Sequence, residues 1–299
     1  MKPGDLLRLL ILGAIWGSSY IFIRILAPAI GPMMTVETRL VIGGAALILY
    51  FRAIKLPVEW SRHWKHYLAV GVINSAVPFL LYAFAALYIP ASYSVILNSS
   101  APLFGAIFAA LWLGERLTSR KILGLVIGAA GVALVARAGP VTITPAITLA
   151  IVACLLAAAC YALAGVYVKK VAAQVEPLAI AGGSHISAAL LLLAPTVFGY
   201  QEIALTPRIA GSVLALALLC SAIAYLFYFR LLADVGPTKA LTVTFLMPAF
   251  GMVWGAVFLH ETITGPMIAG CALILAGTAD VLGILPPAKR VGARGTADP

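Results

Sequence analysis

The sequence predicts an all-α protein that crosses a lipid bilayer many times, and both its composition and its apolar windows indicate this fold class. Of the 299 residues, 63% are hydrophobic and 10% are charged, and the mean hydropathy is +1.07. A water-soluble core cannot hide this much apolar surface. Apolar windows of about 20 residues, the length that crosses the hydrocarbon core of a bilayer, recur along the chain with short connections between them.

Each window is predicted to be one membrane-spanning helix, which gives ten helices. The windows are continuously apolar and far longer than the alternating stretches of about ten residues that build membrane barrels, so strands are excluded. In chain order the windows are residues 6–26, 33–53, 66–88, 91–113, 119–138, 148–168, 178–199, 209–232, 238–259 and 265–285.

The segments around the first three windows fit this division. Lys2 and Arg8 could open a cleavable signal peptide, but further windows follow and no Ala-x-Ala-like site ends the first, so we expect it to be retained. A turn at 28–32 separates the first two windows. The basic second connection contains Trp60 and Trp64, which fit an aromatic belt at the membrane interface.

The basic residues predict the orientation of the chain rather than a nucleic-acid partner. The net charge is +10, and the chain has 20 Lys and Arg. With the N-terminus inside, all but four of these fall on the cytoplasmic side, as the positive-inside rule requires. We therefore expect a multi-pass protein of the plasma membrane, a bacterial inner membrane, with both termini cytoplasmic and a disordered tail at 286–299. The four exceptions are Arg24, Arg39, Arg137 and Arg208.

An internal repeat divides the chain into two similar halves, predicted as domains 1–138 and 139–285. Each half holds five windows, and an odd number makes the second half enter the membrane upside down, around a central cavity. Duplication kept only for packing is the alternative. A shift of 145 positions aligns Trp16 with Tyr161, and a shift of 146 aligns Ser75 with Ser221, Tyr82 with Tyr228, Pro102 with Pro248, Gly105 with Gly251, Glu115 with Glu261, Thr118 with Thr264, Gly124 with Gly270 and Gly131 with Gly277.

A motif near the end of the first half resembles a known family. Residues 113–118 read Leu-Gly-Glu-Arg-Leu-Thr, and glycines follow at positions 124, 128 and 131. This pattern is similar to that of the EamA-type drug/metabolite transporters, as are residues 16–19 (Trp-Gly-Ser-Ser) and Arg39. The second half departs from it where His260 and Ile274 replace glycines. The resemblance covers nearly the whole chain and implies ten helices in two inverted halves, with export of amino acids or other metabolites as the activity.

Two prolines indicate a candidate binding site at membrane depth. Pro102 and Pro248 lie near the middle of windows four and nine, where proline lacks an N–H and frees the carbonyl four residues earlier. Those carbonyls belong to Asn98 and Thr244, and Ser99 adds a hydroxyl. Unpaired backbone at this depth is tolerated only where protein or a water-filled cavity covers it. The alternative is a proline kink whose polar neighbours serve helix packing.

Aromatic and hydroxyl side chains form the second part of the candidate site. Three of them share one face of the first window at helical spacing, and tyrosines in windows three, six and eight add rings that could stack on an organic solute. Packing or lipid contact is the alternative for any single ring. The predicted cavity is lined by windows one, three, four, six, eight and nine. The predicted substrate-binding residues are Trp16, Ser19, Tyr20, Tyr82, Asn98, Ser99, Tyr161, Tyr225, Tyr228 and Thr244.

Charged residues inside the windows need a reason, because each costs about 2.5–3.5 kcal/mol at the centre of a membrane helix. Arg24 and Glu37 lie about equally far from the turn at 28–32, so we expect a structural ion pair between them. Arg39 faces elsewhere and could attract a carboxylate or hold a gate. Its repeat equivalent, His185, could carry a coupling proton or be a hydrogen-bonded packing residue.

These features predict a carrier and not an enzyme. No Gly-x-x-x-x-Gly-Lys-Ser/Thr loop is present to bind ATP, and His260-Glu261 lacks the second histidine of a zinc protease because Thr264 stands there. We expect no metal and no cofactor. We expect a secondary transporter that exports small organic metabolites, above all amino acids including aromatic ones, as a monomer in a lipid bilayer. A channel-like pore and an intramembrane enzyme are the alternatives.

Overall fold

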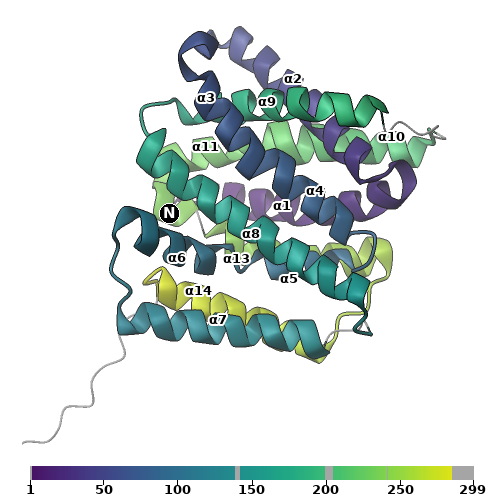
Figure 1. The fold of residues 1–299 in the computed structure, drawn as a ribbon, viewed down its shortest axis with the longest axis vertical. Coiled ribbons are helices and arrows are strands. Elements are labelled where there is room, and N and C mark those ends of the chain that lie inside the picture. The colour runs from purple at the N-terminus through teal and green to yellow at the C-terminus, as the bar shows by residue number, and fades with distance from the viewer. Residues whose placement is uncertain (1, 139–141, 199–204, 241, 285–299) are drawn as a thin grey trace, which may run out of the picture.

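The computed structural model describes residues 2–138, 142–198, 205–240 and 242–284, and all regular secondary structure within these ranges is helical. The helices pack side by side and cross the view of Figure 1 from left to right and back. Eight helical spans are long and apolar enough to cross a membrane, and two further apolar helices are shorter. This confirms the predicted all-α class, with an apolar helical span at each of the ten windows.

The first half holds five spans, and two of them are composite. The third span begins at Trp60 and not at residue 66. The prediction that Trp60 and Trp64 lie in a connection is therefore wrong, because both lie in a helix. In chain order the elements are α1 (Pro3–Ile30), α2 (Pro32–Ala53), α3 (Trp60–Val70), the π-helix η1 (Gly71–Ala76), α4 (Val77–Ala85), α5 (Ala91–Asn98), α6 (Ala101–Leu113) and α7 (Ser119–Ala138).

The second half repeats this arrangement. The predicted disordered tail at 286–299 lies outside the described residues. The elements are α8 (Pro145–Val171), α9 (Pro177–Phe198), α10 (Pro207–Leu214), the π-helix η2 (Ala215–Ile223), α11 (Ala224–Val235), α12 (Pro237–Ala240), α13 (Val243–Leu259) and α14 (Gly265–Val281).

Proline and threonine begin several of these helices. Proline is the first residue of α1, α2, α8 and α9, where its fixed φ suits a helix and its missing N–H has no partner to lose. The hydroxyls of Thr144 and Thr206 accept hydrogen bonds from the N–H groups of Ile147 and Ile209, at 3.2 and 3.3 Å, and so cap α8 and α10. The Thr118 hydroxyl accepts a hydrogen bond from the N–H of Lys121 at 3.3 Å at the start of α7, whereas the hydroxyl of its repeat equivalent, Thr264, is buried without a partner among the described residues.

The two π-helical segments occupy equivalent places in the two halves. Shifted by 146 positions, η1 falls at 217–222, inside η2. Each segment is a local bulge that turns the residues after it, a feature often found at functional sites. Asn74 and Ser75 lie in η1, and Ser221 lies in η2. Hydropathy carries no signal for either bulge.

The fourth span is broken where the sequence predicted one helix over residues 91–113. α5 ends at Asn98, and Ser99 and Ser100 form a turn before α6 begins. Pro102 is therefore in the first turn of α6. In the second half Pro248 does lie inside α13, as predicted, and the break comes earlier, between α12 and α13. The two halves are thus similar but not identical at this point.

The two ends of the bundle differ in charge. The α2–α3, α6–α7 and α8–α9 connections lie together at the left of Figure 1, and we call this the basic end because Lys55, Arg116 and Lys170 lie at these connections. The α1–α2 and α4–α5 connections lie at the right, which we call the opposite end.

The fifth and tenth spans pack together along one edge of the bundle, where α7 and α14 run side by side in Figure 1. Glycines bring the two backbones close. A Cβ on Gly124 would lie 2.6 Å from the carbonyl oxygen of Gly277, and one on Gly131 would lie 2.7 Å from that of Gly270. Because Gly124 is equivalent to Gly270 and Gly131 to Gly277, these two contacts are the same contact related by the repeat.

Candidate functional site

A cavity of about 500 Å³ lies between the two halves. All of the predicted binding residues except Ser99 line it, and so does Arg39. Windows one, three, four, six, eight and nine contribute, as predicted, but α2 and α9 contribute as well, through Arg39 and Ser184. Whether these residues bind a substrate stays a prediction.

The aromatic walls of the cavity follow the repeat. The rings of Trp16 and Tyr228 have centroids 5.3 Å apart, and those of Tyr161 and Tyr82 are 6.1 Å apart. Since Trp16 is equivalent to Tyr161 and Tyr228 to Tyr82, the two halves make the same contact once each. Tyr20 breaks the symmetry: its ring packs edge-on against Tyr82 at 5.3 Å.

Asn98 is held in the wall by a tyrosine. The Tyr82 hydroxyl donates a hydrogen bond to Asn98 Oδ1 at 2.7 Å, and both side chains are buried. Asn98 is the last residue of α5, so the break in the fourth span places its amide beside the cavity. Ser99 lies outside the lining. Its hydroxyl donates to the carbonyl of Val95 at 3.2 Å, and its own carbonyl accepts from Thr278 at 3.4 Å.

Arg39 is fixed by contacts with both halves. Its Nε donates a hydrogen bond to Ser221 Oγ at 2.9 Å, and its guanidinium carbon lies 3.8 Å from the centre of the Phe79 ring. The Ser221 hydroxyl in turn donates to the carbonyl of Leu216 at 3.3 Å, inside η2. Arg39 is 7% exposed.

His185 lies behind the cavity wall. It is fully buried, its Nδ1 is 2.9 Å from the carbonyl oxygen of Ala181, and its Nε2 has no hydrogen-bond partner among the described residues. Its ring packs edge-on against Tyr225 at 5.4 Å and against Phe79 at 6.0 Å. Phe79 and Tyr225 are repeat equivalents, so Arg39 and His185 occupy matching places around one pair of rings. A proton-coupling role for His185 stays a prediction.

The expected ion pair between Arg24 and Glu37 is absent. Arg24 donates instead to the backbone carbonyl of Ala86, and both carboxyl oxygens of Glu37 are buried without a hydrogen-bond partner. Equal distance from a turn puts two side chains at the same level but does not make them face each other, because each also depends on its rotation about its own helix.

The cavity extends toward the basic end. Val168 near the end of α8, Pro177 at the start of α9 and Leu232 near the end of α11 all line it. In the other direction the lining stops at Ile23, Arg39 and Phe79, and we call this the blind end. Within the described residues, no lining residue belongs to a connection at the opposite end.

A glutamate from the second half joins the α13–α14 connection to the start of α5 at the opposite end. The carboxylate of Glu261, in the α13–α14 connection, accepts hydrogen bonds from the backbone N–H groups of Ala91 and Ser92 at 2.7 and 2.9 Å. It thereby caps α5, a role that its position before Thr264 did not predict. Gly255 leaves room for it, because a Cβ there would lie 2.5 Å from Glu261 Oε2.

Its repeat equivalent, Glu115, makes different contacts at the basic end. The carboxylate of Glu115 forms ion pairs with Lys121 and Lys169, each at 3.1 Å. These two ammonium groups, through their hydrogen bonds, hold the pKa of the Glu115 carboxyl below its usual value. The same residue in the two halves thus caps a helix at one end and pairs with lysines at the other.

Sequence reasoning missed several lining residues, among them Asn74, Phe79, Ser184 and Met247. Asn74 had a signal, because an amide inside an apolar window is costly unless it is bonded or faces water. Phe79 and Met247 had no such signal, because the sequence does not show whether an apolar side chain faces lipid, the protein core or a cavity.

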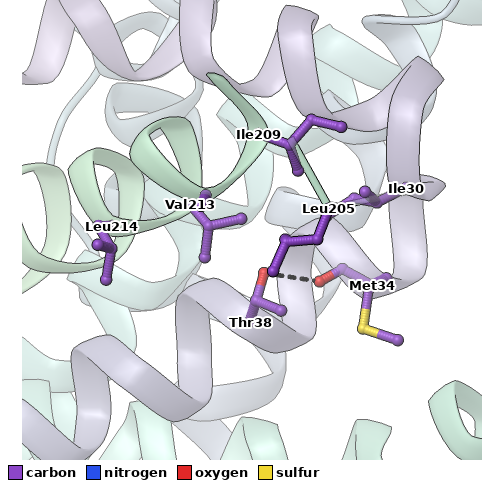
Figure 2. A pocket seen from close by; sticks show the side chains of 8 residues that line it. Ile30, Met34, Thr38, Leu205, Ile209, Val213 and Leu214 are labelled. Atoms are coloured by element: carbon purple, nitrogen blue, oxygen red, sulfur yellow. Dashed lines mark hydrogen bonds between the residues drawn. The ribbon is translucent and has the colours of Figure 1, made fainter. Parts of the chain in front are cut away.

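A second hollow, of about 310 Å³, lies between α2 and α10 and is almost wholly apolar. Figure 2 shows Ile30, Met34, Ile209 and Val213 around it, together with the Thr38 hydroxyl. That hydroxyl is already bonded to the carbonyl of Met34 at 2.8 Å, the dashed line in Figure 2. This hollow therefore offers little to recognise a polar solute.

A family model matches the chain twice, over residues 3–137 and 148–282, and its description is the EamA-like transporter family. The chain belongs to this family. The transporter motif at 113–118 lies in the first match, and the two matches correspond to the two halves of the fold. An EamA-like chain of this kind is a multi-pass membrane protein of a transporter family.

Relatives with similar sequences bear names consistent with the EamA-like family. The chain is 26% identical to the uncharacterized transporter YvbV of Bacillus subtilis over 92% of this chain and 90% of that protein. It is 25% identical to the protein PecM of Dickeya dadantii, over 87% and 86%. It is 27% identical to the uncharacterized inner membrane transporter YedA of Escherichia coli K12, over 84% and 81%.

The fold also matches a solved structure. A crystal structure superposes with a TM-score of 0.67 over 95% of this chain and 98% of that one, at 21% sequence identity. At this identity the match concerns the fold alone.

Proposed function

We propose that this protein is a secondary carrier that exports small organic metabolites, amino acids with aromatic side chains among them, by alternating access. The observation that carries the proposal is a cavity built from both inverted halves and lined by aromatic rings, whose described lining reaches toward the basic end and not the opposite end. Two similar halves that can exchange shapes would open such a site to either side in turn. A channel would instead need an opening toward both ends.

Two sets of repeat-related contacts support an exchange of shapes. Arg39 bonds to Ser221, but in the matching place His185 Nε2 and Ser75 Oγ are both buried without a partner. A buried unpaired group costs about 1–3 kcal/mol, so an arrangement in which His185 meets Ser75 would recover part of what breaking the Arg39 bond costs. The glutamates differ in the same manner, because Glu261 caps α5, whereas Glu115 forms ion pairs with Lys121 and Lys169.

The differences between the halves favour a resting state open toward the basic end. The equivalent of Ala91, whose N–H bonds to Glu261, is Pro237, which has no N–H. The equivalent of Gly255 is Ala109, whose Cβ would occupy the room that Glu115 would need to make the matching contact. The closure at the opposite end therefore has no equally strong counterpart at the basic end. If the basic end is cytoplasmic, this state loads substrate from the cell, as export requires.

The distribution of basic residues supports a location and an orientation for the chain. We place the chain in the plasma membrane with both termini in the cytoplasm, since nearly all Lys and Arg then obey the positive-inside rule. The relative YedA is named an inner membrane transporter. A reporter enzyme that works only outside the cytoplasm, fused at the C-terminus, should be inactive, and an active fusion would reverse the orientation.

Counterflow in liposomes tests the carrier. Purified protein is reconstituted into liposomes that are loaded with unlabelled phenylalanine, tyrosine, tryptophan or leucine. The labelled amino acid is then added outside, with and without a pH gradient. In a carrier, uptake saturates and is accelerated by substrate inside the liposomes. In a pore, uptake does not saturate and internal substrate does not accelerate it. Asn98→Ala and Trp16→Ala should reduce uptake without loss of folding. If no amino acid exchanges, the proposed substrate class is wrong.

A further inference from the structure

The blind end of the cavity holds a positive charge that the described residues leave unpaired. Among the described residues that line the cavity, Arg39 alone is charged. Every ion pair that the described carboxylates form involves another basic residue, and Glu37 on the same helix is unpaired too. A cation inside a membrane helix is costly without a counter-charge. Among the described residues, no carboxylate supplies the missing partner of Arg39.

The contacts of Arg39 leave one edge of its guanidinium unused. Nε is bonded to Ser221, and one flat face lies on the Phe79 ring. Of the five N–H donors of an arginine, the four on the two terminal nitrogens have no hydrogen-bond acceptor among the described residues. Two parallel N–H groups along that edge match the two oxygens of a carboxylate.

We propose that Arg39 is the binding site for the carboxylate of the transported solute and that the substrates are organic monocarboxylates with a planar or aromatic body. The inference rests on the proposed carrier function and narrows its substrate class. The carboxylate enters first and reaches the blind end, and the body lies back along Tyr82, Tyr161 and the Trp16–Tyr228 pair toward the basic end. A cavity of about 500 Å³ accommodates a solute of this kind.

An amino group is tolerated but not required in this site. No carboxylate lines the described cavity, so an ammonium would be held only by aromatic faces and amide oxygens. Amino acids and their deamino analogues should therefore both bind. Solutes that keep the ammonium but lose the carboxylate should not.

Competition on the unaltered protein tests this directly. Counterflow of labelled phenylalanine is measured against unlabelled 3-phenylpropionate, phenylalaninamide and 2-phenylethylamine. All three carry a phenyl group; the first keeps the carboxylate without the ammonium, and the other two keep the ammonium without the carboxylate. We expect 3-phenylpropionate to compete and the two amines to be at least about tenfold weaker, since a bidentate charge-assisted pair is worth a factor of ten or more. Equal competition by the amide would overturn the assignment.

A binding readout without transport separates the site from the carrier function. In detergent, 3-phenylpropionate should raise the unfolding temperature of the protein, because it binds the folded state. Arg39→Gln should lose this shift, and Arg39→Lys should keep a smaller one, as the charge stays but the planar fork is lost. The control is Arg137→Gln, an exposed arginine near the end of α7, which should behave as the unaltered protein.

The outcomes distinguish the two proposals. Binding that depends on Arg39 without exchange across liposomes would keep the carboxylate site and overturn the carrier. Exchange of solutes that persists in Arg39→Gln would overturn the carboxylate site and keep the carrier. If no carboxylate either binds or exchanges, the carboxylate site and the proposed amino-acid substrate class are both wrong. Should Arg39→Gln fail to fold, the competition series on the unaltered protein still decides.

Discussion

At the scale of single residues, the Tyr82 hydroxyl is the group most directly linked to the proposed site. It holds the Asn98 amide beside the cavity at 2.7 Å. Tyr82→Phe would leave a buried amide oxygen unpaired, which costs about 1–3 kcal/mol. We expect lower thermal stability and at least about tenfold weaker uptake of substrate. Without the hydroxyl the Asn98 amide loses its position, and a lost interaction of this energy weakens binding by about that factor.

Tyr93→Phe is the matched control for Tyr82. The Tyr93 hydroxyl also donates a buried hydrogen bond, to the carbonyl of Val135, but Tyr93 does not line the cavity. It should lose a similar amount of stability and keep the uptake. If both variants transport equally well, Tyr82 acts only in packing.

The unpaired carboxyl of Glu37 gives a second prediction at the residue scale. Both of its oxygens are buried without a hydrogen-bond partner among the described residues, and an ionised carboxylate would be very costly in such surroundings. Glu37→Gln should therefore leave the unfolding temperature unchanged or raise it. Glu261→Gln is the contrasting variant and should lower it, because an amide has one acceptor oxygen where Glu261 uses two.

A clear loss of stability in Glu37→Gln would mean that the carboxyl is ionised and paired, contrary to the contacts described. The unfolding temperature of each purified variant in detergent decides between these outcomes.

At the scale of elements, the edge formed by α7 and α14 depends on glycines that let the backbones touch. A Cβ on Gly124 would come within 2.6 Å of the Gly277 carbonyl oxygen, a backbone atom that cannot move away alone. Gly124→Ala should therefore destabilise the protein by about 1–3 kcal/mol, the usual cost of overpacking. Thermal unfolding in detergent measures it.

Gly211→Ala provides the control, because nothing lies within 4 Å of a Cβ at that position of α10. It should be neutral or slightly stabilising, since alanine favours a helix more than glycine does. Equal effects of the two substitutions would show that the close approach of α7 and α14 has no energetic weight.

At the scale of the whole molecule, the question is which end of the cavity is closed. Glu261 ties the α13–α14 connection to the start of α5, so Glu261→Ala should weaken the closure at the opposite end. In a background whose four cysteines are replaced, a cysteine in place of Ile23, at the blind end, should become more reactive toward an impermeant thiol reagent added at the opposite end.

Glu115→Ala is the repeat-matched control for Glu261→Ala. It removes the equivalent carboxylate from the basic end, where Glu115 pairs with Lys121 and Lys169, and should leave the reactivity of the cysteine at position 23 unchanged. If Glu115→Ala raises the reactivity of that cysteine as much as Glu261→Ala does, the two glutamates stabilise the fold in general, and Glu261 does not specifically stabilise the closed opposite end.

The sequence by itself determined the class, the ten spans and the two halves. Hydropathy is a local property, and lipid requires about 20 apolar residues wherever the chain crosses, so each span was visible on its own. The repeat then aligned Trp16 with Tyr161 and Tyr82 with Tyr228, and these four rings do meet around one cavity. Their approximate level in the membrane followed from their positions in the windows.

Only the tertiary structure decided which groups meet. The bond from Arg39 to Ser221, the cap of α5 by Glu261, the unpaired Glu37 and the placement of His185 behind the wall all depend on helix rotation and on the π-helical bulges. A side chain turns through about 100° with each residue along a helix, so a bulge of one residue redirects those that follow it. Hydropathy places each helix in the membrane but leaves its rotation open; packing against helices far away in the sequence fixes that rotation, and with it the site.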